Sequence, residues 1–306
     1  MRWLYHLISR GTRLGDAYAP ESLATEGFVH CSYRDEVRES ARLHFPAGAE
    51  LDVLRIDPRR VPARVEEAPT PRGPMPHVHG PIPRDAIVET LSLGSLGEAP
   101  DRVTGTRFTF VAFEGMTLLD LVGALDPVSR VASMGFDPTS RVTIVSATAP
   151  MVWGGLGAAL VAHRVRPPLD DTDVLVIPGG HGTRALVNDR DVADWLATYP
   201  HNRLVATVCT GSLLLGAAGR LRGVRATTHP SMMAELPGYG AVPVDARLVD
   251  EGSIVTAGGV SCALDLGLHL VRRLEGDDVA EKIAAQMCLP PDFVTASRRA
   301  TGTEKA

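Results

Sequence analysis

Short runs of uninterrupted apolar residues, each followed by a helical pattern, dominate the chain after residue 107. The clearest are Val174–Ile177 and Leu204–Val208, and Ile254–Ala257 repeats the theme. A strand without polar alternation is one that is buried on both faces, as in a parallel sheet covered by helices on each side. Strands that alternate with helices pair in parallel through right-handed crossovers. The sequence therefore predicts an α/β domain with a doubly wound, mostly parallel sheet.

The remaining elements of this domain alternate in the same way. Strands are expected at Arg107–Phe113, at Arg141–Ser146, and as two short strands within Val152–Val165. Helices are expected at 117–132, with Pro127 kinking the helix or starting a second segment, and at 183–199, 211–218 and 260–273. The chemistry of such sheets collects at the carboxyl ends of the strands. Three unusual features of the sequence follow strands at those ends.

The composition and periodicity of the sequence change near residue 100, and this change divides the chain into two parts. Gly, Ser and Pro residues without sustained periodicity fill the stretch from Leu91 to Thr106, which is typical of a linker. Before it the sequence is irregular and rich in Pro between Pro58 and Pro83. We therefore expect a smaller N-terminal α+β domain at residues 1–95, a linker at 96–106, the α/β domain at 107–293 and a flexible tail at 294–306.

Charge and composition exclude several classes of function. The 306 residues carry a formal net charge of −5 and no Lys/Arg-rich run, so we expect no nucleic-acid partner. No apolar run reaches the length of a membrane span, and charged residues interrupt the first 20 positions where a signal peptide would lie. The four cysteines show no C-x-x-C pair, which predicts no metal site. We expect a soluble cytoplasmic protein with reduced thiols and no membrane association.

The first of the three features is Cys209, which lies between an apolar strand and a helix with almost no loop between them. Such a tight turn holds a side chain above the sheet, as in the nucleophile elbow of hydrolases. A helix N-terminus also stabilises a thiolate, so a lowered thiol pKa is expected. The alternative is a buried cysteine that acts as a small hydrophobic residue. That alternative is preferred for Cys31, Cys262 and Cys288.

The second feature is the Gly-rich segment that follows Val174–Ile177. Gly179 and Gly180 let backbone N–H groups approach a ligand closely, and the two amides are candidates for a substrate-binding or oxyanion site. Most glycine clusters only form turns, so this signal is weak by itself. His181 follows as a candidate substrate-binding residue in the loop, and it is not assigned as the catalytic base.

The third feature is Asp120, which is flanked by apolar residues in the expected helix 117–132. A buried carboxyl is costly unless a function uses it. Burial would raise its pKa and allow proton exchange near neutral pH. The alternative is an exposed aspartate on the polar side of an amphipathic helix.

These features together resemble the DJ-1/PfpI superfamily over residues 107–293, and within it the isonitrile hydratase branch. The matching stretches are L-L-D-L-V-G (118–123), V-L-V-I-P-G-G-H-G (174–182), V-C-T-G-S-L-L-L-G-A-A-G-R-L-R-G (208–223), R-A-T-T-H (225–229) and I-V-T-A-G-G-V-S-C-A-L-D (254–265). The resemblance implies a flavodoxin-like fold, shared with class I glutamine amidotransferases, and a homodimer. It also implies that Cys209 is the nucleophile, that Asp120 transfers protons and that Thr210 assists.

The resemblance implies a covalent hydration of a small-molecule substrate that needs no cofactor and no metal. Cys209 would attack an isonitrile carbon, and Asp120 would cycle as general acid and base. Two positions depart from the family pattern, because Pro230 follows the T-T-H histidine in place of Trp, and Ala124 replaces the usual Pro. Both changes would reshape the pocket and so bear on the choice of substrate. His229 is expected to line this pocket or to serve the fold.

The N-terminal residues resemble the DUF952 family of bacterial domains of unknown function. The stretches that carry the resemblance are G-F-V-H-C-S (27–32) and M-P-H-V-H-G-P-I-P (75–83), with His79 in the place of the usual Tyr. His6, His30 and His77, with Glu66 or Glu67, are candidates for a polar pocket suited to anion binding or acid/base work. The alternative is a set of scattered, hydrogen-bonded histidines. The sequence does not indicate whether this domain has its own activity, covers the cysteine pocket or mediates assembly.

Two other classes of function compete with the hydratase. The cysteine could act on an aldehyde, an imine or a specialised-metabolite intermediate, since all present an electrophilic carbon to a thiol. A non-enzymatic redox or ligand sensor is the second class, because the superfamily includes the ligand-binding halves of AraC-type regulators. Such regulators carry a DNA-binding region after the α/β domain, and the short stretch after Phe293 is expected to be too small for one.

Overall fold

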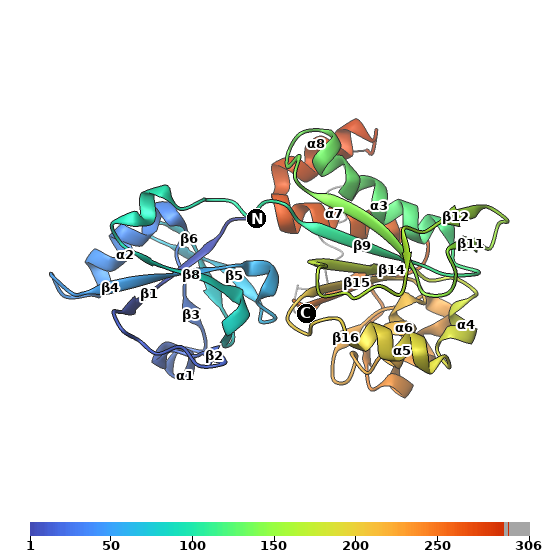
Figure 1. The fold of residues 1–306 in the computed structure, drawn as a ribbon, viewed down its shortest axis with the longest axis horizontal. Helices are drawn as coiled ribbons and strands as arrows, with labels where there is room; N and C mark the ends of the chain where they lie inside the picture. Colours follow the sequence, from blue (N-terminus) through green and yellow to red (C-terminus); the bar gives the residue numbers. More distant parts are fainter. Residues whose placement is uncertain (291–292, 294–306) are drawn as a thin grey trace. The chain divides into compact units, whose positions relative to one another are not determined.

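The computed structural model describes residues 1–290 and 293, and these form two compact units that meet in sequence between Val103 and Thr104 (Figure 1). Leu96 and Ala99, within the stretch expected to be a linker, pack into the core of the first unit with Tyr5. The tail expected at 294–306 lies outside the described residues. Among the described helices, none is long and apolar enough to cross a membrane.

The N-terminal unit is built mainly from strands. One antiparallel sheet has the order β1 (Leu4–Ser9), β4 (Leu51–Ile56) and β8 (Ile87–Ser92), and a second has the order β3 (Val29–His30), β6 (Gly73–Val78) and β5 (Val65–Thr70). The strands β2 (Ala17–Tyr18) and β7 (Ile82–Pro83) pair separately. The helices are α1 (Glu21–Thr25) and α2 (Val37–His44), with short 3-10 turns at Arg34–Glu36, Pro58–Arg60, Arg84–Ala86 and Ser95–Glu98.

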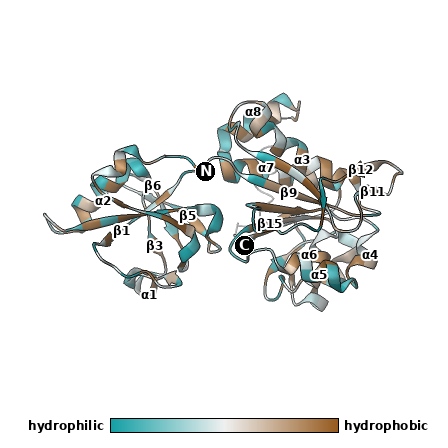
Figure 2. Cartoon of the chain, viewed as in Figure 1, coloured by the Kyte–Doolittle hydropathy of each residue, from teal (hydrophilic) through white to brown (hydrophobic). Residues whose placement is uncertain are grey.

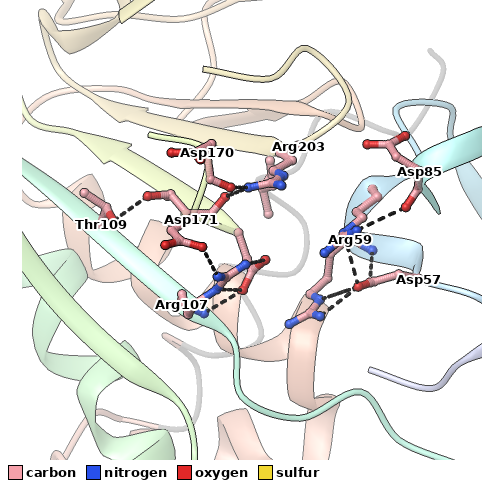
Figure 3. Close-up of polar contacts among 12 residues, drawn as sticks. Asp57, Arg59, Asp85, Arg107, Thr109, Asp170, Asp171 and Arg203 are labelled. Carbon is pink, nitrogen blue, oxygen red and sulfur yellow. Dashed lines mark hydrogen bonds and ion pairs between the residues drawn. The ribbon is translucent and has the colours of Figure 1, made fainter. Parts of the chain in front are cut away.

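A buried ion pair fixes the turn that follows β4. The Asp57 carboxylate is 1 % exposed, and it accepts hydrogen bonds from the Arg59 backbone N–H at 3.0 Å and from the Arg59 guanidinium at 2.7 Å (Figure 3). Breaking a buried pair would leave an uncompensated charge, so this contact specifies the turn strongly.

The second unit contains a seven-stranded sheet in the order β13 (Arg164–Val165), β10 (Arg141–Ser146), β9 (Arg107–Ala112), β14 (Val174–Ile177), β15 (Leu204–Val208), β19 (Ile254–Ala257) and β18 (Leu248–Asp250). Every neighbouring pair is parallel except β18 with β19. The residues of β14 and β15 are all buried, and the hydrophobic colouring of the central strands is visible in Figure 2. The predicted doubly wound, mostly parallel α/β sheet with a smaller N-terminal domain is confirmed.

Helices cover both faces of this sheet (Figure 1). One face carries α3 (Leu118–Ser133), α7 (Cys262–Glu275) and α8 (Asp277–Gln286), and the other carries α4 (Thr183–Leu186), α5 (Arg190–Ala197) and α6 (Gly211–Ala217). The remaining elements are the hairpin β11 (Met151–Trp153) with β12 (Ala159–Val161), the pair β16 (Arg225–Ala226) with β17 (Val242–Pro243), and a 3-10 segment at Pro230–Tyr239.

One predicted helix is wrong, because residues 183–199 form two helices and not one. The Asp189 side chain accepts hydrogen bonds from the backbone N–H groups of Asp191 and Val192, and it thereby caps a new helix, α5. Asp is among the preferred residues for this capping position. The helix expected at 117–132 is continuous through Pro127.

A charged contact anchors the start of β9 beside the start of β14. The Arg107 guanidinium binds both carboxylate oxygens of the buried Asp173 at 3.0 Å, and it also contacts Asp171 at 2.7 Å (Figure 3). Bidentate pairing between arginine and carboxylate combines geometric specificity with a strong hydrogen bond. This anchoring holds the two strands whose carboxyl ends lead to the candidate site.

Candidate active site

The strands β9, β14, β15 and β19 are parallel neighbours, so their carboxyl ends lie at one edge of the sheet. The segments that follow these strands carry Asp120, Gly179, Cys209 and Gly258. This edge is where ligands bind in open α/β sheets. The three sequence features that were expected at strand ends are therefore brought together.

Cys209 lies directly after β15 with a backbone φ of 56°. A positive φ is unfavourable for a residue with a side chain, and it persists only where surrounding contacts impose it. The Cys209 N–H donates to the carbonyl oxygens of Ala257 and Gly258, both at 2.9 Å, and its carbonyl accepts from the Thr228 hydroxyl at 2.9 Å. The expected tight strand-to-helix turn is present, and contacts to β19 and Thr228 hold it.

Asp120 lies in the first turn of α3 and is 0 % exposed. One carboxylate oxygen, Oδ2, accepts a hydrogen bond from the Gly179 N–H at 3.1 Å. The other, Oδ1, is buried and has no hydrogen-bond partner within the described part of the chain. Burial raises the pKa of Asp120 to about 6, although the Gly179 N–H and the Cys209 side chain act in the opposite direction. The predicted buried carboxyl with a raised pKa is confirmed, and the exposed alternative is wrong.

The Cys209 thiol and the Asp120 carboxyl lie close enough to change each other's pKa. Burial and the negative charge of Asp120 raise the pKa of Cys209 to about 11, while the N–H and hydroxyl of Thr210 favour the thiolate. The expected lowering of this pKa by the following helix is wrong, because desolvation and the neighbouring carboxylate outweigh it. The Asp120 carboxyl therefore ionises at lower pH than the Cys209 thiol.

The two glycine amides hold the side chains around Cys209. Gly179 N–H donates to Asp120, and Gly180 N–H donates to the Thr210 Oγ1 at 3.0 Å. A Cβ on Gly179 would lie 2.5 Å from the Thr210 nitrogen and 2.8 Å from the Cys209 Cβ, so only glycine fits. Both N–H groups thus have partners within the protein. The predicted oxyanion role of these amides stays a prediction.

Thr183, at the start of α4, supports the same loop although the sequence analysis did not single it out. Its side chain is buried, and its hydroxyl lies 2.8 Å from the Gly180 carbonyl oxygen and 3.0 Å from the Thr210 Oγ1. The only available signal was a hydroxyl residue at a helix start directly after the glycine cluster. Thr210 itself is buried and precedes α6, as expected.

The two candidate histidines occupy different surroundings. His229 is half-buried and its Nδ1 accepts from the Ser231 N–H at 3.2 Å, so it caps the 3-10 segment that follows. A Cβ on Gly259 would lie 2.7 Å from the His229 ring, which shows that the ring packs against the loop after β19. His181 is exposed, and its Nδ1 accepts from Arg184 at 2.9 Å. The predicted substrate contacts of both histidines stay predictions.

The other cysteines differ in their exposure. Cys31 and Cys262 are buried, as predicted, whereas Cys288 is exposed. The predicted core position of Cys288 is wrong, because this residue lies beyond the last turn of α8 with a φ of 56°. Across the described residues, no group of three or more His, Cys, Asp or Glu side chains is placed to hold a metal ion.

Comparison with known families decides the identity of the second unit. The model described as "DJ-1/PfpI family" matches residues 106–273, which is more than half of the chain. The chain belongs to the DJ-1/PfpI family. A second model, described as "Protein of unknown function (DUF952)", matches residues 10–90. Both resemblances found in the sequence are confirmed.

Relatives in the family have different kinds of names. An isonitrile hydratase from Pseudomonas putida is 34 % identical over 183 residues, which cover 60 % of this chain and 78 % of that protein. Drosophila melanogaster protein DJ-1alpha is 33 % identical over 119 residues, which cover 38 % of this chain and 55 % of that protein.

Solved structures show the same variety. A THiJ/PfpI family protein from Pseudomonas syringae superposes with a TM-score of 0.55 at 32 % identity, covering 62 % of this chain and 77 % of that one. An AraC family transcriptional regulator from Pseudomonas putida superposes with a TM-score of 0.52 at 26 % identity, covering 60 % of this chain and 99 % of that one. Membership of the family therefore establishes the fold and leaves the reaction to be argued from the site.

Proposed function

We propose that the chain is a cysteine-dependent hydratase that converts an isonitrile and water into an N-substituted formamide. The main support for this proposal is that the fully buried Asp120 carboxyl lies near Cys209, a nucleophile in a strained backbone conformation. The two residues follow different strands of the sheet. A buried base beside a thiol is the arrangement that nucleophilic catalysis requires. The similarity to an isonitrile hydratase supports the choice of substrate.

The first half-reaction forms a bond between Cys209 and the substrate. The Asp120 carboxylate removes the thiol proton as the sulfur attacks the terminal carbon of R–N≡C, and the same carboxyl then gives that proton to this carbon. The product is a thioimidate, R–N=CH–S–Cys209, and Asp120 returns to its ionised form. A base with a pKa of about 6 is suited to this exchange, since it is ionised at neutral pH and still gives up a proton readily.

The second half-reaction releases the product. Asp120 takes a proton from water as the oxygen attacks the thioimidate carbon, and it passes this proton to the substrate nitrogen. The resulting tetrahedral adduct expels the Cys209 sulfur, which regains its proton through Asp120, and leaves R–NH–CHO. The exchange consumes one water and requires no oxidant or reductant. Thr210 supports the sulfur through its N–H and hydroxyl, and both groups favour the thiolate form.

Three alternatives to the isonitrile hydratase can be compared with the site. An aldehyde or an imine would meet the same pair of groups, since either presents an electrophilic carbon to the Cys209 thiol. A redox sensor is disfavoured, because thiol oxidation follows thiolate character and the pKa of Cys209 is raised to about 11. A ligand sensor is supported by the likeness to an AraC family regulator.

The proposal includes a homodimer and a reducing compartment such as the cytoplasm. Exposed apolar residues gather on α3 and on the neighbouring hairpin β11–β12, and they form what we name the apolar patch: Leu119, Val122, Trp153, Leu156 and Val161. The Gly155 N–H donates to the Met116 carbonyl at 2.9 Å, which joins the hairpin to the start of α3. A reducing compartment suits the four unpaired cysteines.

Incubation of the purified chain with cyclohexyl isocyanide tests the reaction directly. Formamide would be measured by chromatography, and the covalent intermediate by intact-protein mass spectrometry. Turnover is expected in the wild type, no adduct in Cys209→Ala, and turnover reduced by about 10²–10⁴-fold in Asp120→Asn. Cys288→Ser serves as the matched thiol control and should keep full activity, since this residue is exposed and outside the site.

Either of two results would contradict the proposal. Formamide production that persists in Cys209→Ala would show that the cysteine is not the nucleophile. Absence of turnover and of adduct in the wild type, while Cys209 still reacts with iodoacetamide, would reject the isonitrile and direct the search to aldehydes and imines.

A further inference from the structure

Three histidines line one face of the small sheet β3–β6–β5 in the N-terminal unit. The antiparallel register places His30 opposite His77, and His77 opposite Glu66. Residues directly opposite in such a ladder point to the same side of the sheet. His79 extends the row, since its Nε2 lies 3.2 Å from the Glu66 carboxylate. We name His30, His77 and His79 the histidine face.

Phe28 fixes the rings of this face. Its ring stacks on His77 with a centroid distance of 4.0 Å and an interplanar angle of 9°, and it meets His30 edge-on at 4.7 Å. The His30 and His77 rings lie 5.2 Å apart. The three imidazoles are therefore held together by packing around one phenyl ring, and their arrangement is not that of scattered surface histidines.

His6 is not part of this face, although the sequence grouped it with His30 and His77. Its ring is buried, with Nδ1 2.6 Å from the His30 carbonyl and Nε2 3.0 Å from the Tyr18 hydroxyl. Burial is the main cause that lowers the pKa of His6. Glu67 also lies elsewhere, since it binds the Tyr33 hydroxyl.

The histidine face is open to solvent and has unused donors. The side chains of His30 and His79 are 52 % and 33 % exposed. The His30 Nε2 lies 3.0 Å from Glu26, whereas the His77 ring has no hydrogen-bond partner in the described part of the chain. A ligand at this face could therefore accept hydrogen bonds from His77 without breaking an existing contact.

Protonation of the three imidazoles reverses the sign of the net charge at the histidine face. The charged groups around the imidazoles are Glu26, Glu66 and Arg64, and the Arg64 guanidinium lies 2.8 Å from Glu66. Together with the three histidines, these six side chains carry a formal charge of −1 when the imidazoles are neutral and +2 when all are protonated. Burial, followed by the charges of His30 and His79, lowers the pKa of His77, and Glu66 and Glu26 oppose this effect.

We propose that the histidine face binds a phosphate group, and that binding is coupled to protonation of the imidazoles. A tetrahedral dianion accepts charge-assisted hydrogen bonds from several imidazolium and guanidinium groups at once. A metal ion is a poorer match, because no three His, Cys, Asp or Glu side chains of the described residues are placed around one point. All residues of the histidine face belong to the N-terminal unit, whereas Cys209 belongs to the other unit.

Calorimetric titration of the full chain with sulfate and with inorganic phosphate tests this site. Sulfate remains a dianion between pH 6 and pH 8, so its pH dependence reports on the protein alone. Sulfate is expected to bind about 10-fold more tightly at pH 6 than at pH 8, with proton uptake seen as a buffer-dependent heat. Phosphate should bind at pH 6 more tightly than acetate, which offers one pair of oxygens in place of a tetrahedral set.

Two variants test whether sulfate binds at the histidine face. His77→Gln and Arg64→Gln are each expected to weaken sulfate binding about 10-fold at pH 6. Arg64 is 70 % exposed, so its variant tests the site even where His77→Gln fails to fold. His201→Gln, an exposed histidine of the other unit, and Cys209→Ala should bind as the wild type does.

Three outcomes would contradict the proposed site. The first is sulfate binding that does not change with pH. The others are sulfate binding that is unchanged in both His77→Gln and Arg64→Gln, and sulfate binding that is lost in Cys209→Ala. Acetate binding as tight as phosphate would reject the phosphate assignment, and absence of any anion binding at pH 6 would reject the site as a whole.

Discussion

The Gly179 N–H donates a hydrogen bond of 3.1 Å to the Asp120 carboxylate, and this contact joins the end of β14 to the first turn of α3. The Gly179 carbonyl accepts in turn from the Thr117 N–H at 2.9 Å. The two bonds fix the start of α3 relative to the glycine loop. Since the same loop packs against Cys209, the distance between carboxyl and thiol depends on Gly179.

Replacement of Gly179 by alanine should therefore impair catalysis. A Cβ at this position would lie 2.5 Å from the Thr210 nitrogen, so the loop must shift away from Cys209. A displacement of about 1 Å at a reacting group can reduce turnover by about 10²-fold. The matched control is Gly238→Ala, since no atom lies within 4 Å of a Cβ there. Equal activities of the two variants in the isonitrile assay would contradict the role of Gly179.

The pH dependence of turnover should show a single acidic limb. Asp120 must be ionised to take the thiol proton, and its pKa is about 6. We expect kcat/KM to fall about tenfold per pH unit below this value and to stay level up to about pH 9. No basic limb is expected in that range, because the pKa of Cys209 is raised to about 11. A limb near pH 8 would instead indicate a thiolate formed before substrate binds.

Asp120→Asn should stabilise the protein while it reduces activity. The folded state raises the pKa of Asp120 from 3.8 to about 6, so folding favours the protonated carboxyl. The ionised form thus costs stability at every pH above about 6, and the cost disappears as pH falls toward 4. A shift of this size corresponds to at most ~3 kcal/mol. Urea unfolding at pH 8 should show Asp120→Asn as the more stable protein, with the difference gone at pH 4.

Much of the second unit was predictable because its strands are buried on both faces. Val174–Ile177, Leu204–Val208 and Ile254–Ala257 lie where the apolar runs predicted them. Helix boundaries were less certain, since the break before α5 depends on a single capping side chain, Asp189. The short antiparallel strand β18 has too few residues to show a periodic pattern in the sequence. Its position in the sheet is determined by its pairing with β19.

The residues of the candidate site were also only partly predictable from the local sequence. Cys209 and Asp120 were found because a thiol at a strand end and a carboxyl among leucines are locally unusual. Their pKa values depend on which side chains meet across the fold, so the direction of the Cys209 shift was predicted wrongly. Thr183 and Thr228 were missed because a buried threonine carries no distinctive local pattern.

Thr183 should act on catalysis by positioning Thr210. Thr183→Val removes the hydroxyl that lies 3.0 Å from the Thr210 Oγ1 and leaves the Gly180 N–H as the remaining donor to that oxygen. Loss of such a bond costs about 1–3 kcal/mol, so kcat should fall by about 10-fold or more while KM changes little. Thr183→Ser keeps the hydroxyl and should retain most of the activity. An equal loss in both variants would indicate a packing role for the methyl group alone.

The apolar patch should form the contact between two subunits of a homodimer. Leu156 at the hairpin tip is 92 % exposed, and Val122 on α3 is 43 % exposed. Large exposed apolar patches mark interaction surfaces. Leu156→Asp combined with Val122→Glu should therefore convert a dimer into a monomer, as measured by analytical ultracentrifugation. Leu43→Asp is the matched control, since Leu43 is 52 % exposed in the N-terminal unit. A dimer that survives the double variant, or is lost in Leu43→Asp, would place the contact elsewhere.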